Sequence, residues 1–202
     1  MASSRPWLRS LGTSVRALLI FTLLTGVLYT AVVLGIGQAL LPAQANGSVL
    51  RNSDGEVIGS ALIGQSFTDA DGAALPEWFQ SRPSAAGDGY DGGASGGSNL
   101  GPENPDLIEA IEQRRAAIAE LEQVDPREVP ADALTASSSG LDPHISVEYA
   151  LLQVPRVAEA RELEESAVRD LVESMIESRV LGYIGEPTVT VLTLNAALAE
   201  LD

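Results

Sequence analysis

The chain has 202 residues and a formal net charge of −16, with twelve basic residues that are all arginine, one histidine and no cysteine. This charge excludes a protein that binds nucleic acid through basic patches, and it disfavours docking on anionic lipid headgroups. The missing cysteines exclude disulfides and thiolate metal sites, and the single histidine excludes a multi-histidine metal centre within one chain.

The longest apolar run is residues 17–41, which carry no charge. As a helix rising ~1.5 Å per residue, this run would cover ~37 Å and could cross a hydrocarbon core of ~30 Å. Three arginines precede it, and positive residues beside a membrane helix tend to stay in the cytoplasm. The pattern therefore predicts a cytoplasmic head at residues 1–16, a transmembrane helix at 17–41 and an extracytoplasmic domain at 42–202.

A cleaved signal peptide is the alternative interpretation of this region. Arg5, Arg9 and Arg16 would form its positive segment, and residues 43–45 (AQA) resemble a small-residue cleavage site. The apolar core of a signal peptide has only ~7–15 residues, however, and this run is longer. The length favours a retained, single-pass anchor in the cell membrane, so that the lipid bilayer is one partner of the chain.

Residues 42–202 suffice for one domain with a modest core. Nine arginines stand against twenty-eight acidic residues there, a formal charge of −19. The mixture of strand and helix patterns that follows predicts an α/β fold. Two apolar pieces, 48–50 and 57–63, flank an Asp-Gly turn signal at residues 54–55, which predicts a β-hairpin.

A glycine-rich tract (GDGYDGGASGGSNLG) occupies residues 87–101. It is typical of a flexible linker. The alternative is a loop wrapped on a partner surface, because tyrosine, aspartate and asparagine are interspersed among the glycines.

A helix is predicted from Asn104, which can cap it, to the residues before Asp125. Its charged residues, including Arg114, are expected on a solvated face. The expected apolar stripe is Leu107, Ile108, Ile111, Ile118 and Leu121.

Asp142 with Pro143 is predicted to cap and start another helix, which Pro155 breaks. A further helix is expected from residue 164 to the glycine at 182, with an apolar stripe of Val168, Leu171, Val172, Met175 and Ile176. Residues 188–194 (TVTVLTL) alternate like a half-buried strand, after which Asn195 would cap a terminal helix.

Two patterns have the residue types of a serine hydrolase. Ser95 lies in GASGG, which matches a nucleophile elbow in letters, but its flanks lack the buried strand and the helix that an elbow needs. Ser139, Asp142 and His144 include the three types of a catalytic triad, although residues so close in sequence seldom converge in that geometry. No catalytic residue is therefore expected. A secreted or membrane-anchored serine hydrolase using Ser95 or Ser139 with His144 is the alternative to a non-enzymatic accessory protein.

An amino-terminal membrane helix followed by six ordered blocks resembles the C subunit family of Kdp-type potassium-transporting P-type ATPases over nearly the whole chain. The six blocks are GS.LIGQ at 59–65, F..RPSA at 79–85, SGGSNLGP with a following NP at 95–105, TAS.SGLDPHIS at 135–146, QV.RVA.AR at 153–161 and VL.LN at 191–195.

The resemblance implies an accessory subunit of an ATP-driven, high-affinity potassium importer. It implies two partners: a channel-like subunit that translocates potassium and a pump subunit that hydrolyses ATP. It also implies a catalytic chaperone that supports assembly and raises the pump subunit's affinity for ATP. No cofactor is expected to bind this chain directly, because the complex handles both ATP and potassium.

Partner contacts are expected in two places. In the domain, the candidate contact residues are Ser98, Asn99, Ser137, Ser139, Asp142, His144 and Arg156. In the membrane, Gly26 and Thr30 lie on one helical face with Val33 or Leu34, and small residues permit close approach of helices. This face is the predicted docking surface for partner helices.

Overall fold

A computed structural model of the protein describes residues 5–201. Residues 1–4 of the predicted head and residue 202 of the predicted domain lie outside this range. Contacts within the chain divide it after Ser48 into two compact units, a long helix and a domain, which are described separately.

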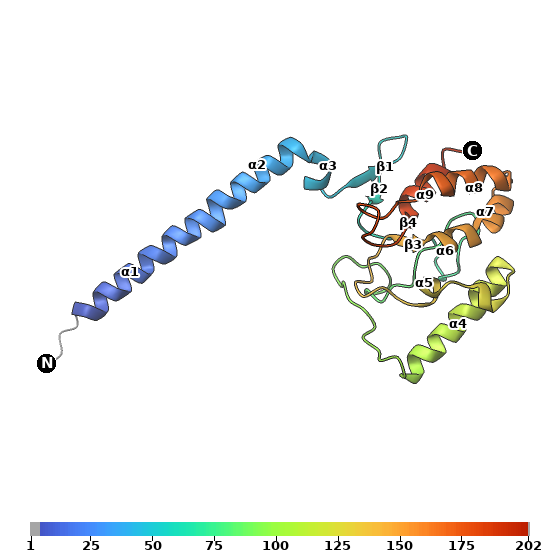
Figure 1. Ribbon diagram of the computed structural model, residues 1–202, viewed down its shortest axis with the longest axis horizontal. Helices are drawn as coiled ribbons and strands as arrows, with labels where there is room; N and C mark the ends of the chain where they lie inside the picture. Colours follow the sequence, from blue (N-terminus) through green and yellow to red (C-terminus); the bar gives the residue numbers. More distant parts are fainter. Residues whose placement is uncertain (1–4, 202) are drawn as a thin grey trace. The chain divides into compact units, whose positions relative to one another are not determined.

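The first unit is continuous helix over most of its length, composed of α1 (Arg5–Phe21), the π-helical segment η1 (Thr22–Tyr29) and α2 (Thr30–Leu40) (Figure 1). Within the described residues one helical span, Trp7–Leu40, is long and apolar enough to cross a membrane.

The helix begins at Arg5 and therefore includes much of the predicted head. Helix α2 ends at Leu40, and Leu41 leaves the helical region with φ −135° and ψ 54°. A residue before proline is disfavoured in the α conformation, and Pro42 follows. One further turn, α3 (Pro42–Ala45), completes the unit.

The second unit is a mixed helix and strand domain, as the sequence predicts. Its elements are β1 (Val49–Arg51), β2 (Val57–Ser60), α4 (Pro105–Glu122), the 3-10 helix η2 (Pro126–Glu128), α5 (Ala131–Leu134), β3 (His144–Ser146), α6 (Val147–Leu152), α7 (Val154–Ala160), α8 (Glu165–Ser174), β4 (Thr188–Thr190) and α9 (Val191–Leu198).

The described strands form two antiparallel pairs, β1 with β2 and β3 with β4. The first pair is the predicted hairpin, and Asn52 Oδ1 closes its turn by accepting hydrogen bonds from the backbone N–H groups of Asp54 and Glu56. In the second pair His144 lies opposite Thr190, and a bridge from Glu177 to Thr188 adds a third segment at the edge of β4.

Helix α4 has the predicted bounds, because Asn104 caps it by accepting a hydrogen bond from the N–H of Asp106. Its apolar stripe is confirmed in part: Ile111 and Ile118 pack against the core, whereas Ile108 is exposed. The predicted break at Pro155 is also confirmed, since α6 ends at Leu152 and α7 begins with Val154.

The helix predicted at Asp142 is wrong. His144–Ser146 form strand β3 instead, and α6 begins only at Val147. The helix cap is Ser146, whose Oγ accepts a hydrogen bond from the N–H of Tyr149 at 3.0 Å. Asp142 uses its carboxylate on the N–H and the ring of His144, so it is not available as a cap.

Two predicted boundaries near the C-terminus are also wrong. Helix α8 ends at Ser174, well before Gly182, because the chain turns to pair Glu177 with β4. Strand β4 ends at Thr190, and the following VLTL residues belong to α9, since their apolar side chains also fit a helical spacing. Asn195 is therefore inside α9 and does not cap it.

The core of the domain lies among α6, α7, α8, α9 and the strands β3 and β4. Phe79 is fully buried in it and joins the segment before the glycine-rich tract to these helices. Asn195 holds that segment in place, because its side chain accepts from the Phe79 N–H and donates to the Phe79 carbonyl, both at 2.9 Å. The backbone at Phe79, from which the following loops extend, is therefore fixed to the core.

Candidate functional site

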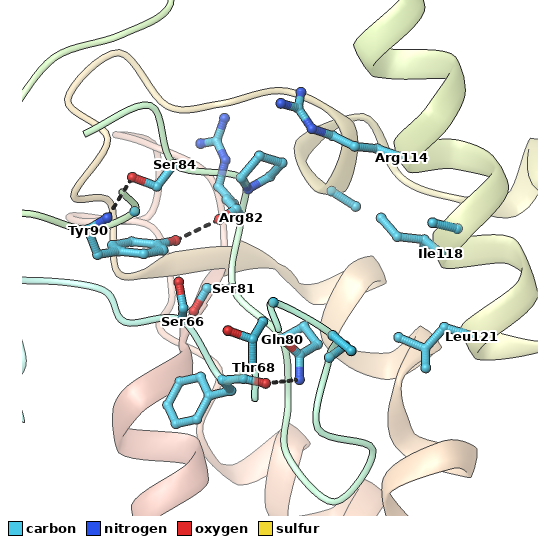
Figure 2. A pocket seen from close by; sticks show the side chains of 18 of the residues that line it. Ser66, Thr68, Gln80, Ser81, Arg82, Ser84, Tyr90, Arg114, Ile118 and Leu121 are labelled. Atoms are coloured by element: carbon cyan, nitrogen blue, oxygen red, sulfur yellow. Dashed lines mark hydrogen bonds between the residues drawn. The ribbon is translucent and has the colours of Figure 1, made fainter. Parts of the chain in front are cut away.

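A hollow of about 700 Å³ lies between α4 and the loop that runs from Ser66 to Tyr90 (Figure 2). One wall is the apolar stripe of α4, with Ile118 and Leu121. The opposite wall is polar, and Figure 2 shows Arg82 on it beside Ser84 and Tyr90. The hollow thus presents hydrogen-bonding groups across from a hydrophobic surface.

Two arginines line this hollow. Arg114 projects from α4, and one of its guanidinium nitrogens donates to the carbonyl of Leu134 at 2.9 Å. It forms no ion pair with a carboxylate within residues 5–201. Arg82 Nε is buried without a hydrogen-bond partner in the same range. In so acidic a domain, the Arg114 guanidinium can also receive a carboxylate or carbonyl oxygen from another chain, whereas Arg82 Nε is out of reach of one.

Arg82 also joins this hollow to a second one of about 570 Å³, lined by the Ser137–His144 segment. Its guanidinium donates to Asp142 Oδ2 at 2.8 Å, and Asp142 Oδ1 lies 3.0 Å from His144 Nδ1. Hydrogen bonding to His144 is the main cause that lowers the pKa of Asp142, and the same bond raises the pKa of His144. The three side chains therefore form a connected, partly exposed network at the surface.

The glycine-rich tract is held by the neighbouring 137–141 segment, although it has no helix or strand. Gly96 N–H donates to the Ser139 carbonyl at 2.8 Å, and the Ser95 hydroxyl donates to the same carbonyl at 3.0 Å. Ser84 Oγ donates to the Gly140 carbonyl at 2.6 Å while accepting from the N–H of Tyr90. These contacts contradict a free linker within the domain.

Gly140 is required where the two segments meet. Its φ is +68°, and a Cβ there would lie 2.6 Å from Ala86 Cβ and 2.8 Å from the Gly96 carbonyl oxygen. Neither the backbone conformation nor the space permits a side chain without movement of a neighbour. The close approach of these two polar loops is therefore built into the sequence.

The geometry of a serine hydrolase is not present. Asp142 and His144 are paired, but within residues 5–201 no serine hydroxyl is hydrogen-bonded to the His144 ring. Ser139 Oγ accepts from the N–H of Leu141, and Ser95 donates to a carbonyl. A serine nucleophile needs its base within hydrogen-bond reach. The described residues also contain no cluster of three acidic or histidine side chains suited to a metal ion.

The candidate contact residues fall into separate groups. Ser98, Asn99 and Ser139 are exposed, and Asn99 adopts a left-handed φ of 54°. Ser137 is buried, and its hydroxyl oxygen accepts from the Gly140 N–H. The last candidate, Arg156, belongs to a different, internal network.

The Arg156 side chain is only 8% exposed, and that of Glu122 is fully buried. Arg156 Nε lies 3.0 Å and 3.1 Å from the two Glu122 carboxylate oxygens. The other two guanidinium nitrogens of Arg156 donate to the Gln153 side chain and to the carbonyls of Pro76 and Trp78. Burial raises the pKa of Glu122, and Arg156 opposes that rise. This network joins α4, α7 and the 76–80 segment, and it leaves Arg156 little surface for a partner.

Gly26 and Thr30, the residues predicted to dock against partner helices, lie along the helix of the first unit. Gly26 is inside the π-helical segment, and Thr30 is the first residue of α2. Both are exposed, and the Thr30 hydroxyl reaches the Thr25 carbonyl at 3.4 Å.

Sequence reasoning assigned Arg114 and the carboxylates of α4 to a solvated face, which is wrong for Arg114 and Glu122. The signal was present, because Arg114 lies three residues after Ile111 and Glu122 four residues after Ile118, on the same stripe. Tyr90 was also missed. Its hydroxyl donates to the Arg82 carbonyl at 2.7 Å, and burial raises its pKa to about 12.

Comparison with known proteins identifies the family. A family model described as "KdpC: K+-transporting ATPase, c chain" matches residues 11–200. A potassium-transporting ATPase KdpC subunit of Kineococcus radiotolerans is 52% identical over 191 residues, which cover 95% of this chain and 93% of the relative. The KdpC subunit of Caulobacter vibrioides is 49% identical over 195 residues, covering 96% and 91%.

A KdpC subunit of Mycobacterium tuberculosis is 48% identical over 194 residues, covering 96% of this chain and 99% of the relative. The match thus includes the apolar helix and the domain together. The chain belongs to the family of KdpC subunits of potassium-transporting ATPases.

Proposed function

We propose that this chain is an accessory, non-catalytic subunit whose domain lies outside the cytoplasm and holds the transporter together. Its partners are the channel-like potassium-translocating subunit and the ATP-hydrolysing pump subunit. The observation that carries the proposal is the interlocked pair of loops, 84–101 and 137–144, which present polar side chains on a rigid base without catalytic geometry. Rigid loops on a scaffold commonly carry binding.

The contact surface comprises the exposed residues Ser98, Asn99 and Ser139 together with the Asp142–His144 pair. A rigid loop loses little conformational entropy when it binds, so polar contacts there retain more of their free energy. The neighbouring Arg114 offers hydrogen bonds to an acidic partner group. The acidic remainder of the domain would also favour cations near the extracytoplasmic approach to the ion path.

Co-purification from membranes tests this assembly role. The wild-type chain is expected to retain both large subunits in mild detergent, and an Asn99→Trp, Ser139→Trp double variant is expected to lose them while its domain stays folded. Ser53→Trp, at an exposed position in the turn between β1 and β2 and outside both loops, is the matched control. Full retention by the loop variant would contradict the proposed contact surface.

The orientation can be tested directly, because the chain contains no cysteine. A single Ser98→Cys substitution should react with a membrane-impermeant maleimide added outside the cytoplasmic membrane, whereas Ser10→Cys should react only after permeabilisation. The opposite pattern would reverse the orientation. Amino-terminal sequencing that finds Asn46 first would show that the helix is removed as a signal peptide.

The family resemblance adds a role in raising the ATP affinity of the pump subunit. With the domain outside and ATP inside, such an effect has to pass through contacts between subunits. ATPase activity of the complex, measured against ATP concentration with and without this chain, tests that role. A serine hydrolase would instead react with a fluorophosphonate at Ser95 or Ser139, and we expect no labelling.

A further inference from the structure

A tight turn between α8 and β4 exposes four large apolar side chains: Val180, Leu181, Tyr183 and Ile184. They are 64%, 77%, 72% and 49% exposed, respectively. We call these four residues the apolar tip. None of them belongs to the buried core cluster of the domain, so the fold does not use them. Single exposed apolar residues are ordinary, but a contiguous group is typical of an interaction site.

The apolar tip has a fixed backbone. Val180 N–H donates to the Ile184 carbonyl at 2.9 Å, and Ile184 N–H donates back to the Val180 carbonyl at 3.0 Å. Leu181 and Gly182 both take left-handed conformations, with φ of 55° and 81°. A leucine in this conformation is strained. The chain thus places a bulky apolar side chain at a turn position where glycine or asparagine would cause less strain.

The charges beside the apolar tip disfavour lipid as its occupant. Arg179 is the one basic residue between positions 171 and 190, and it is paired with Glu186. Glu173 and Glu177 are exposed on the segment that leads to the turn. Segments that bind a membrane surface usually place basic residues beside their apolar ones. Here the surroundings are acidic, in a domain that is already strongly negative.

A protein surface fits these features better. The centres of protein interfaces are enriched in tyrosine and depleted of charge, and a few buried anchors supply most of the affinity. We propose that the apolar tip inserts into an apolar groove with a basic rim on another subunit of the potassium-transporting ATPase complex. This proposal rests on the proposed function as an assembly subunit. It adds a second contact, separate from the polar loops.

The test replaces the apolar tip without disturbing its turn. Leu181→Asn suits the left-handed position, because asparagine tolerates that conformation, and Tyr183→Ser removes the exposed ring. The full-length double variant should lose about tenfold or more of the partner subunits that co-purify with the wild-type chain. The matched control is Val57→Thr on β2, where the side chain is 57% exposed, and it should co-purify normally.

A fluorescent label separates a protein groove from the bilayer. Tyr183→Cys supplies a single attachment site for an environment-sensitive fluorophore on the full chain. Its emission should shift to the blue when the other subunits are present. It should not shift in vesicles of phosphatidylethanolamine and phosphatidylglycerol that contain this chain alone. A shift in those vesicles alone, or no shift in either sample, overturns the proposal.

The two proposals fail in different ways. If the wild-type chain does not co-purify with the other subunits, the assembly role itself is wrong. If the wild type co-purifies and the Leu181→Asn, Tyr183→Ser variant does so equally well, only the apolar tip is excluded as a contact.

Discussion

The Glu122–Arg156 pair lies inside the domain, whereas the Arg82–Asp142 pair lies at its surface beside His144. The side chains of Glu122 and Arg156 are 0% and 8% exposed, and those of Arg82 and Asp142 are 22% and 27% exposed. Both pairs join segments far apart in sequence. The buried pair has every polar group satisfied within the domain, while the open pair faces two hollows and remains accessible to another chain.

The difference in exposure suggests different roles: the buried pair stabilises the fold, and the exposed pair is available for contact with another chain. A buried charge that loses its partner cannot be rescued by water, so the inner pair is expected to control folding. A half-exposed charge is partly screened, so the outer pair is expected to contribute less to stability and to remain adjustable. The following four experiments test that division, and all of them can follow Trp78 fluorescence in a Trp7→Phe background, because the chain has two tryptophans.

The largest effect is expected from Arg156→Met. It leaves the Glu122 carboxylate buried without its cation, so the free energy of unfolding should fall by about 3–5 kcal/mol in urea titrations. A double variant with Glu122→Gln should recover much of that loss, because the uncompensated charge is then absent. A loss below about 1 kcal/mol for Arg156→Met would show that the pair is not an architectural element.

Gly140→Ala tests the scaffold on which the outer pair is placed. The new Cβ would overlap Ala86, and the residue would be held at a positive φ, so we expect a loss of about 2–3 kcal/mol. Gly72→Ala is the control, since its φ is +83° but nothing lies within 4 Å of the added atom. Its loss should be about 1 kcal/mol, from backbone strain alone. Equal losses would mean that the contact between the loops is not tight.

Asp142→Asn breaks the outer pair itself. It removes the charge that Arg82 and His144 share, and it should cost only about 1 kcal/mol of stability because water reaches both partners. Co-purification of the other subunits should fall more than stability does. If Asp142→Asn lowers the free energy of unfolding as much as Arg156→Met does, the distinction between the two pairs is wrong.

The smallest effect is the dependence of stability on pH. The pKa of His144 is raised above its ordinary 6.5, so the stabilisation from its charged form is complete below pH 6.5 and is lost as the pH rises through the raised pKa. The pKa of Asp142 is lowered below its ordinary 3.8, so its contribution is lost only as the pH falls through that lowered value.

An NMR titration can measure this directly, because His144 is the single histidine. The pKa of His144 should return toward the ordinary value in the Asp142→Asn variant. The free energy of unfolding of that variant should then no longer fall as the pH rises above 6.5. An unchanged His144 pKa in that variant would show that Asp142 does not cause the shift.

Local signals made part of this structure predictable. An uninterrupted apolar run specified the long helix, and the Asn104 cap specified where α4 begins, because both depend on neighbouring residues. Both charged pairs escaped prediction for the opposite reason. Glu122 and Arg156 are 34 residues apart, and Arg82 and Asp142 are 60 apart. Nothing local marks such partners as belonging together.

The wrong boundaries have a physical cause as well. Residues 188–194 satisfy a strand alternation and a helical spacing at once, so the choice between them is made by packing. Val191 and Leu194 are buried on α9 against the same core that holds β4. The blocks that identified the family were more informative about function than about secondary structure, since 137–146 mixes a turn, a strand and a helix cap.

The π-helical segment η1 changes the angular phase of the long helix. In such a segment each residue advances the helix through a smaller angle than in an α-helix, because the hydrogen bonds skip one more residue. A stripe traced at three- and four-residue spacing through Gly26 and Thr30 therefore does not stay on one side from α1 to α2. A mutational scan along this helix should show two rows of sensitive positions with a phase change between Thr22 and Tyr29. Such a helix could contact one neighbouring helix through α1 and a different one through α2.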